Sequence, residues 1–287
     1  MRACIVAIAV WVALMASYAF VLRELLPFPG WLVAAAIAGS VVWFGLATAY
    51  GARTSWRDWS AQQRMARGER PDNGDTVCAI GPIRPLLQPL HAPFSGRECV
   101  IYSYKAGVPQ NSGNRETAAR DYVGFGFTRC SVHTPYGTFA LGTFPVLEGF
   151  ADELGDDATG AAYMRTTHFD EVPGLTNMLK AMLGVYRKPP PLRIDWRVGT
   201  PQADPDTSER VEQVVLAGET VTAIGQFASG SGEIIGGSGT YLRLLRGGTP
   251  RAAPAWPFSA IAKLFSGLAI AAAANAALWW LLGAIAR

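Results

Sequence analysis

Charge, cysteine and histidine are all scarce in this sequence. Only 16% of its 287 residues are charged, while 50% are hydrophobic, a composition that fits an ordinary domain with membrane spans added to it. The net charge is only +3, and arginines beside the hydrophobic runs account for it. The sequence therefore lacks the basic surface of a nucleic-acid-binding protein, and we expect no nucleic-acid partner.

Four cysteines are present, and none belongs to a CxxC pair. Cys4 lies in the first hydrophobic run, whereas Cys78, Cys99 and Cys130 lie in the more polar part of the chain. In a cytoplasmic domain these three would be free, buried thiols. In an oxidising compartment Cys78 and Cys99 could pair, and Cys130 would be left over. No HExxH motif and no Cys/His spacing suited to zinc occurs, so we expect no metal and no cofactor.

Motifs for catalysis and for phosphate binding are also missing. The three histidines, His91, His133 and His168, have no nucleophile motif beside them, and no GxSxG sequence occurs. Two glycine-rich stretches, Gly124–Gly126 and Gly225–Gly239, lack the Lys and the helix start that a phosphate loop needs. The first lies inside a strand-like segment, and flexible hairpin structure is the favoured interpretation of both. The sequence favours a non-enzymatic protein without excluding an enzyme.

Three long runs contain no charged residue: Ala3–Leu22, Trp31–Tyr50 and Leu264–Ile285. Each has about 20 residues, which as a helix at ~1.5 Å per residue spans about 30 Å, the hydrocarbon thickness of a bilayer. A helix of that length on a soluble globule keeps one polar face. The runs are therefore predicted to be transmembrane helices.

The first run has a second interpretation. Arg2, an apolar stretch and the small residues Ser17 and Ala19 would also suit a cleaved signal peptide. However, the run is long for a signal sequence, and the second run follows after a turn at Pro27–Gly30. A transmembrane hairpin over residues 1–50 is the favoured interpretation.

Basic residues are unevenly distributed about the three runs. Most lie after the second run or before the third: Arg53, Arg57, Arg64, Arg67, Arg70, Arg243, Arg246, Arg251 and Lys263. The opposite side has only Arg23 and Arg287. By the positive-inside rule, the domain between the second and third runs faces the cytoplasm, and we expect the membrane to be a bacterial inner membrane.

Residues 51–74 form a basic segment that contains two tryptophans at the position of an interfacial aromatic belt. The candidates for contact with a lipid surface are Trp56, Trp59, Arg53, Arg57, Arg64 and Arg67. Two interpretations are equally supported. Either the span frays into a solvated helix, or a helix here lies on anionic headgroups.

Residues 75–257 show mainly the alternating pattern of β-strands. Strands are predicted at 76–80, 99–104, 122–133, 138–141, 193–198, 210–216, 220–227 and 240–245, with an extended connection at 81–93 and a Gly/Ser loop at 229–239. Val100, Tyr102 and Tyr104 are expected on one face of their strand. Pro135-Tyr136-Gly137 fits the type I turn of a hairpin.

An insertion at about 151–191 has a helical pattern instead. Its apolar residues recur at helical spacing: Leu175, Met178, Leu179, Met182, Leu183 and Tyr186. We interpret them as a core face rather than a ligand groove, on a helix stopped by Pro189–Pro191. The predicted fold class is an α+β membrane protein: a β-rich soluble domain with a helical insertion, flanked by transmembrane helices.

The soluble region resembles a known family. Three segments are similar to the opening of the GIDE domain, also called BAM for "beside a membrane": Gly81-Pro82-Ile83, Pro89-Leu90-His91-Ala92-Pro93 and Ser95-Gly96-Arg97-Glu98-Cys99-Val100-Ile101-Tyr102. Thr138–Leu141 and Leu216–Val221 resemble later parts of that domain, and the resemblance covers roughly residues 75–227, poorly over the insertion. It implies structural roles: Pro93, Gly96 and Gly218 in turns, and Cys99, Val100 and Tyr102 in a strand core.

Eukaryotic members of that family are mitochondrial ubiquitin ligases, whose zinc-binding RING follows the last span. No cysteines follow the last span here, so RING chemistry is not expected. We expect a membrane-anchored, non-catalytic interaction or scaffold protein, with the lipid bilayer and a further membrane or cytoplasmic protein as partners. The alternatives are a ligase-related protein without RING chemistry and a lipid-sensing membrane protein.

Small residues predict close packing between the second run and the C-terminal helix of residues 258–287. They recur four apart, as Ala35 with Gly39 and as Gly267 with Ala271, which lets helix backbones approach. Ser40 and Asn275 lie near the middle of their spans and are predicted to form a hydrogen bond with each other. The rival interpretation pairs Asn275 with its copy in a second chain.

Overall fold

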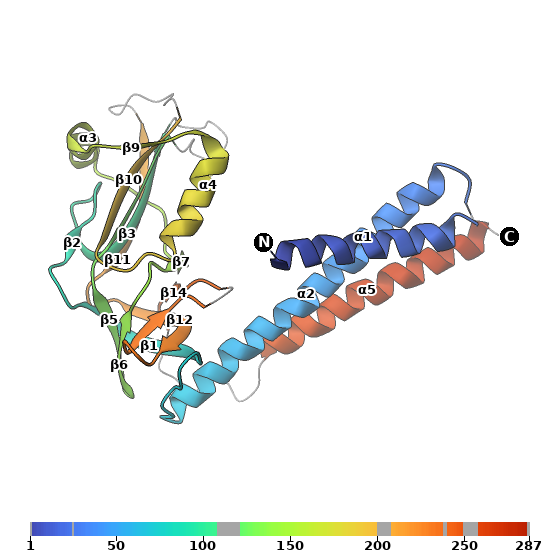
Figure 1. The fold of residues 1–287 in the computed structure, drawn as a ribbon, viewed down its shortest axis with the longest axis horizontal. Coiled ribbons are helices and arrows are strands. Elements are labelled where there is room, and N and C mark those ends of the chain that lie inside the picture. Colours follow the sequence, from blue (N-terminus) through green and yellow to red (C-terminus); the bar gives the residue numbers. More distant parts are fainter. Residues whose placement is uncertain are drawn as a thin grey trace. The chain divides into compact units, whose positions relative to one another are not determined.

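The computed structural model describes residues 2–24, 26–107, 121–199, 208–237, 240–248 and 258–285. The chain forms two compact units, Met1–Ser60 with Pro254–Arg287, and Ala61–Ala253. The first unit is helical, and the second is built mainly of strands (Figure 1). The sequence-based expectation of a mixed fold, with a β-rich body between apolar helices, is confirmed.

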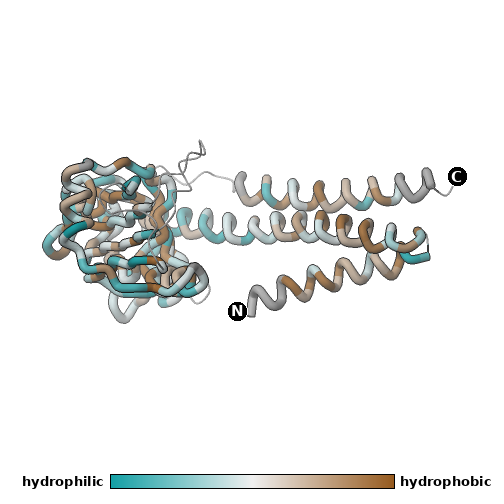
Figure 2. Tube along the Cα trace, turned by 90° about the horizontal axis from the view of Figure 1, so that it is seen from above, coloured by the Kyte–Doolittle hydropathy of each residue, from teal (hydrophilic) through white to brown (hydrophobic). Residues whose placement is uncertain are grey.

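Three helices make up the helical unit: α1 (Arg2–Leu22), α2 (Gly30–Ala66) and α5 (Phe258–Ile285). Among the described residues, α2 and the Ala260–Trp280 part of α5 are long and apolar enough to cross a membrane. The apolar part of α1, Ile8–Leu22, is shorter. Hydrophobic residues recur along all three helices (Figure 2). Many are exposed: Phe44, Phe265 and Trp280 expose 63%, 67% and 73% of their surface.

Helix α2 is longer than the predicted span. It runs without a break from Gly30 to Ala66, and it ends where Gly68 adopts a left-handed conformation and donates its N–H to the carbonyl of Met65. No helix-ending residue precedes Gly68 in the basic segment. Residues 51–66 therefore continue the same helix as the second hydrophobic run, and contact of this segment with headgroups stays a prediction.

One sheet of the β-rich unit contains a closed ring. Its strands, in order, are β1 (Thr76–Pro85), β5 (Cys130–Thr134), β6 (Gly137–Leu141), β13 (Glu233–Ile235), β12 (Thr220–Ala228), β14 (Arg243–Arg246) and β7 (Val146–Glu148). β1 also pairs with β12, so a closed ring is formed by β1, β5, β6, β13 and β12. Closure protects the edges of these strands. The predicted hairpin is confirmed at β5–β6, where Thr134 pairs with Gly137 across Pro135 and Tyr136.

The second sheet is open. Its strands, in order, are β8 (Glu153–Leu154), β11 (Glu209–Leu216), β3 (Glu98–Gly107), β4 (Tyr122–Phe127), β10 (Leu192–Val198) and β9 (Asp170–Val172), and β2 (Leu90–His91) pairs with β3. The largest core joins this sheet to the ring and to α4 (Gly174–Val185), through residues such as Phe127, Val132 and Met178. A second core joins Tyr104 of β3 to Met164 of α3 (Asp157–Thr166).

A β-bulge in β3 decides which of its side chains share a face. Val215 pairs with Ile101 but Leu216 pairs with Cys99, so Val100 is the extra residue. Val100 therefore joins Ile101 in the largest core, while Tyr102 and Tyr104 lie in the second. The prediction that Val100 shares a face with the tyrosines is wrong, because strict alternation assumes that no bulge occurs.

Gly124 and Gly126 lie inside strand β4, which confirms the strand-like segment predicted there, and they do not form a flexible hairpin loop. A Cβ atom at Gly124 would come within 2.1 Å of the Tyr104 ring, and one at Gly126 within 2.2 Å of the Tyr102 ring. Both residues have to be glycine because the tyrosines of the neighbouring strand lie directly over them. The GxG sequence is therefore a packing motif.

Strand boundaries differ from the predicted ones in two places. β1 continues to Pro85, into the stretch expected to be a connection, and β13 forms inside the predicted Gly/Ser loop. Pairing explains both: Ile83–Pro85 pair with β5, and β13 pairs with both β12 and β6. Partners distant in sequence, which no local pattern shows, supply the hydrogen bonds that make these residues strands.

The insertion contains two helices, and only part of its apolar stripe is core. In α4, Met178 and Val185 are fully buried, whereas Leu179 and Leu183 are 49% and 51% exposed. The prediction of a single core face is therefore wrong for these two leucines, since the stripe is wider than the surface that α4 packs against; the side chain of Leu175 is outside the described part. The helix ends at Val185, before the prolines.

Candidate functional site

Polar side chains inside the helical unit are paired across helices. The indole N–H of Trp11 donates to Ser40 Oγ at 3.2 Å, and the Tyr18 hydroxyl donates to Asn275 Oδ1 at 2.5 Å. The predicted bond between Ser40 and Asn275 is therefore wrong. The prediction considered only α2 and α5, but α1 supplies the partner for both polar groups.

Small residues bring α2 and α5 together, but not all at the predicted positions. A Cβ atom at Gly267 would lie 2.4 Å from the carbonyl oxygen of Gly45 and 2.6 Å from the N of Ala49. Gly39 instead faces Met15 of α1, and Ala35 is buried beside α1 with Leu22. The predicted pair Gly267 and Ala271 does lie at the α2–α5 contact, because a Cβ at Gly45 would meet Ala271 at 3.1 Å.

These contacts satisfy polar groups between the helices, while many apolar side chains remain exposed. The side-chain amide of Asn275 both accepts and donates, since its Nδ2 also donates to the carbonyl of Ala271 at 2.8 Å. Ile37, Phe44 and Phe265 remain more than 60% exposed. Water would penalise such a surface, whereas a lipid environment favours apolar exteriors and satisfied polar interiors.

The candidates for lipid-surface contact fall into two groups. Trp56, which is 51% exposed, lies 5.2 Å from Trp59 between ring centroids, and Arg53 and Arg57 are exposed on the same part of α2. Arg64 and Arg67 are instead engaged with carboxylates, Asp75 at 2.9 Å and Glu69 at 3.1 Å. The sequence could not show these ion pairs, because they depend on how the chain turns after α2.

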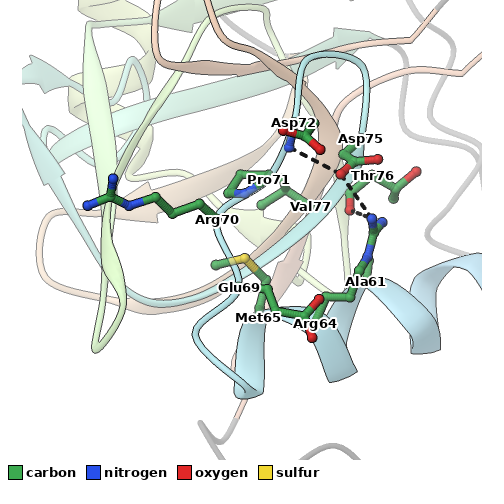
Figure 3. Close-up of a pocket in the computed structure, with 10 residues that line it drawn as sticks. All are labelled: Ala61, Arg64, Met65, Glu69, Arg70, Pro71, Asp72, Asp75, Thr76 and Val77. Carbon is green, nitrogen blue, oxygen red and sulfur yellow. Dashed lines mark hydrogen bonds and ion pairs between the residues drawn. The ribbon is translucent and has the colours of Figure 1, made fainter.

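A small polar pocket of about 130 Å³ lies where the chain turns after α2 (Figure 3). Arg64 donates to Asp75 Oδ2 and to the carbonyl of Thr76 at 3.2 Å, and the backbone N–H of Asp72 also donates to Asp75 Oδ2, at 3.1 Å. Arg70 extends away from this cluster in Figure 3. With Glu69 also lining it, the pocket has more carboxylates than free cations, which does not fit an anionic headgroup.

The hydrogen bonds from Asp72 and Arg64 both act on the Asp75 carboxylate. The N–H of Asp72 lowers the pKa of the Asp75 carboxyl most, and Arg64 lowers it further by hydrogen bonding and by charge, while burial acts in the opposite direction. Asp75 therefore stays ionised and fixes the turn that follows α2. The polar groups around the pocket therefore hold the turn after α2 in place, within the β-rich unit.

The most organised polar cluster of the β-rich unit surrounds Asp195 on β10. Its Oδ1 accepts hydrogen bonds from the hydroxyls of Tyr104, at 2.7 Å, and Tyr163, at 2.6 Å, and Arg193 Nε lies 3.3 Å from Oδ2. Asp195 is buried while Arg193 is largely exposed. Two strands and α3 thus converge on a single carboxylate.

The tyrosines of this cluster are held in their neutral form. Burial raises the pKa of the Tyr104 hydroxyl, and the neighbouring Tyr163 and Asp195 raise it further; burial and Asp195 also raise the pKa of Tyr163. Both phenols therefore remain donors, and their bonds occupy Asp195. The cluster lacks a free nucleophile next to a free base, so it fits a structural role that fastens α3 to the sheet.

The residues that carry the family resemblance have structural contacts. Gly96 has a positive φ of +68° in the turn that follows Pro93, and Gly218 one of +85° in the turn between β11 and β12. Cys99 and Tyr102 are buried in β3. Within the turn, the N–H of Phe94 donates to buried Glu212 at 2.9 Å, a contact that sequence reasoning missed because the two residues are distant in the chain.

Cys78, Cys99 and Cys130 are free and buried. Burial, together with Glu212, raises the pKa of the Cys99 thiol to about 12. His133 lies 3.2 Å from Ser131 Oγ and next to Thr138, with no carboxylate among these partners. Among the residues that the structure describes, no group of three His, Cys, Asp or Glu side chains could hold a metal ion.

No family model, no curated protein and no solved structure matches this chain significantly.

Proposed function

We propose that this protein is an integral membrane protein that holds a β-rich, non-catalytic binding domain at the cytoplasmic face of the membrane. The observation that carries the proposal is the bond between Tyr18 and Asn275 inside helices whose outer surface is apolar. A partly buried polar pair between helices that expose apolar side chains such as Phe44 and Phe265 is the arrangement expected of helices surrounded by lipid.

The β-rich unit supports binding rather than catalysis. Its main polar cluster is occupied internally, since both phenols donate to Asp195 and the Phe94 turn is fixed by Glu212. The orientation rests on the arginine distribution, and the resemblance to the GIDE/BAM family supports the same placement beside a membrane. A bacterial inner membrane is part of this proposal.

The first test concerns the anchor. Membranes from expressing cells are washed with alkaline carbonate and then extracted with mild detergent. The chain is expected to stay in the carbonate pellet and to be released only by detergent. Release of the chain by carbonate would show that its apolar helices do not span the bilayer.

The second test concerns binding. The full chain is purified in mild detergent at native expression level, and co-purifying proteins are identified and quantified. The proposal expects a stoichiometric partner that is retained by Tyr163→Phe, because this variant removes only one of the bonds to Asp195. If no partner co-purifies, the proposed binding role is wrong. If Tyr163→Phe abolishes a turnover of small molecules that the wild type performs, the Asp195 cluster is an active site and the proposal of a non-catalytic domain is wrong.

A further inference from the structure

Helix α4 carries a second apolar strip that no described residue of the β-rich unit covers. Met178, Met182 and Val185 pack against the largest core. Leu179 and Leu183 follow one position later on the helix and are about half exposed. Because residues four and seven apart share a helix face, the strip leads to Tyr186, which is partly buried against the largest core.

Basic side chains border the strip. Lys180 follows Leu179 directly, and Arg187 lies four residues after Leu183; both are exposed, as is Lys188. The whole stretch from residue 174 to residue 188 contains no Asp or Glu. α4 thus presents leucines next to cations without any anionic residue of its own.

A pocket of about 320 Å³ opens at the end of the strip, lined by Tyr186, Arg187 and Tyr241 among other residues. The two tyrosine rings are 5.2 Å apart between centroids. Tyrosine combines an apolar ring with a polar hydroxyl and is enriched where hydrocarbon meets headgroups. The leucines, the cations and the tyrosines are therefore all residue types that suit the boundary between hydrocarbon and headgroups.

We propose that α4 binds the surface of an anionic phospholipid bilayer, with Leu179 and Leu183 at the boundary between headgroups and acyl chains. Exposed leucines beside Lys and Arg are the features of an interfacial amphipathic helix. An acidic lipid surface complements the charge of Lys180, Arg187 and Lys188.

The inference rests on the proposed function in one respect: the chain has to be anchored in a bilayer. Anchoring makes the contact of α4 intramolecular, so that a single short helix is sufficient to occupy the surface. The contact assigned to α4 does not depend on Trp56 or on the basic residues of α2.

The test uses the full chain reconstituted into vesicles of phosphatidylcholine with or without phosphatidylglycerol, doped with a photoactivatable phospholipid. Lipid crosslinks are then mapped by mass spectrometry onto the peptides of α1, α2, α5 and α4. Crosslinks on the first three report the anchor, and crosslinks on α4 report the inference, so failure of one is distinguishable from failure of the other.

The wild type is expected to show lipid crosslinks on α4 that increase in anionic vesicles. The double variant Leu179→Ser/Leu183→Ser should reduce them roughly ten-fold, as expected for two half-buried leucines. Lys180→Gln should reduce the anionic signal about five-fold and leave the neutral signal unchanged. The matched control is Leu86→Ser/Leu87→Ser, which alters two leucines that are 54% and 52% exposed outside α4 and should leave the α4 crosslinks unchanged.

The inference is overturned if α4 gains no crosslinks while α2 and α5 do, because the strip would then face a protein or water. Equal loss in the control variant would also overturn it, since the signal would depend on exposed leucines in general. Absence of crosslinks on α2 and α5 would contradict the proposed function itself.

Discussion

The two units of this protein distribute polar and apolar side chains in opposite ways. In the helical unit, Asn275 and Ser40 are hydrogen-bonded inside while Phe44 and Phe265 are exposed. In the β-rich unit, Phe127 and Ile101 are fully buried. The apolar exterior of the helical unit is the arrangement that lipid favours, and the buried core of the β-rich unit is the one that water favours.

The comparison also shows that different forces hold the two units together. Hydrophobic burial stabilises the β-rich unit, but under the proposed membrane location it would supply little between the helices of the helical unit. Close backbone contact at Gly45 and Gly267 and the Tyr18–Asn275 bond take over that role. The same type of substitution should therefore have different effects in the two units.

The largest effect is expected in the core of the β-rich unit. Phe127→Ala removes a fully buried ring that packs edge-to-face on Phe144 and should lower the stability by about 3–5 kcal/mol. Amide hydrogen exchange in β3 and β4 of the detergent-solubilised chain measures it. Leu87→Ala, at an exposed position, should change protection by less than about 0.5 kcal/mol; a similar loss in both variants would mean that the core is not as described.

A smaller effect is expected at the close approach of α2 and α5. Gly267→Val places side-chain atoms against the backbone of Gly45 and Ala49 and should destabilise the helical unit by about 1–3 kcal/mol. Titration of the solubilised chain with a denaturing detergent, followed by circular dichroism, measures this loss. Ala272→Val alters an exposed residue of the same helix and serves as the control. If the two variants behave alike, α2 and α5 are not in contact at Gly267.

The polar pair inside the helices should contribute less again. A double-mutant cycle of Tyr18→Phe and Asn275→Leu is expected to give a coupling of roughly 0.6–2 kcal/mol. Crosslinking separates the possible partners. Tyr18→Cys with Asn275→Cys should form an intrachain bridge, whereas Ser40→Cys with Asn275→Cys should not. A dimer formed by Asn275→Cys alone, without the intrachain product, would favour pairing between two chains.

The smallest effect concerns the turn after α2. The pKa of the Asp75 carboxyl is lowered in the folded protein. Its ionised form therefore stabilises the fold at pH values above 3.8, the usual pKa of the group. This contribution is lost as the pH falls through the lower pKa of the folded state. Asp75→Asn should therefore cost less than about 1 kcal/mol near neutral pH, because the carboxyl is one-third exposed. The difference from wild type should vanish in strong acid; a difference that persists there would exclude ionisation as its cause.

Patterns with local causes were predictable from the sequence. The apolar helices follow from unbroken hydrophobic runs, and the β5–β6 hairpin follows from Pro135 and Gly137. Features that depend on distant partners were not. The Val100 bulge needs β11, the strand character of β13 needs β6, and the bond of Asn275 needs Tyr18 of α1.

The candidate sites show the same limit. Arg64 is a lipid-surface candidate by its position in the sequence, but it is engaged with Asp75, which follows only after the chain turns. The exposed half of the α4 stripe has the same spacing as the buried half, so periodicity alone could not distinguish Leu179 from Met178.

Sidedness is the most direct test of the account, and the native cysteines cannot report it. Cys78, Cys99 and Cys130 are buried, so a thiol reagent would miss them on either side of the membrane. Exposed reporters are therefore needed: Phe28→Cys between α1 and α2, where the side chain is 76% exposed, and Ser229→Cys at an exposed turn of the β-rich unit. Each is placed in a Cys4→Ala background.

Intact cells are treated with a membrane-impermeant maleimide, and labelling is compared before and after permeabilisation. The account predicts that Phe28→Cys is labelled in intact cells and that Ser229→Cys is labelled only after permeabilisation. Labelling of Ser229→Cys in intact cells, or equal labelling of both reporters in intact cells, would contradict it.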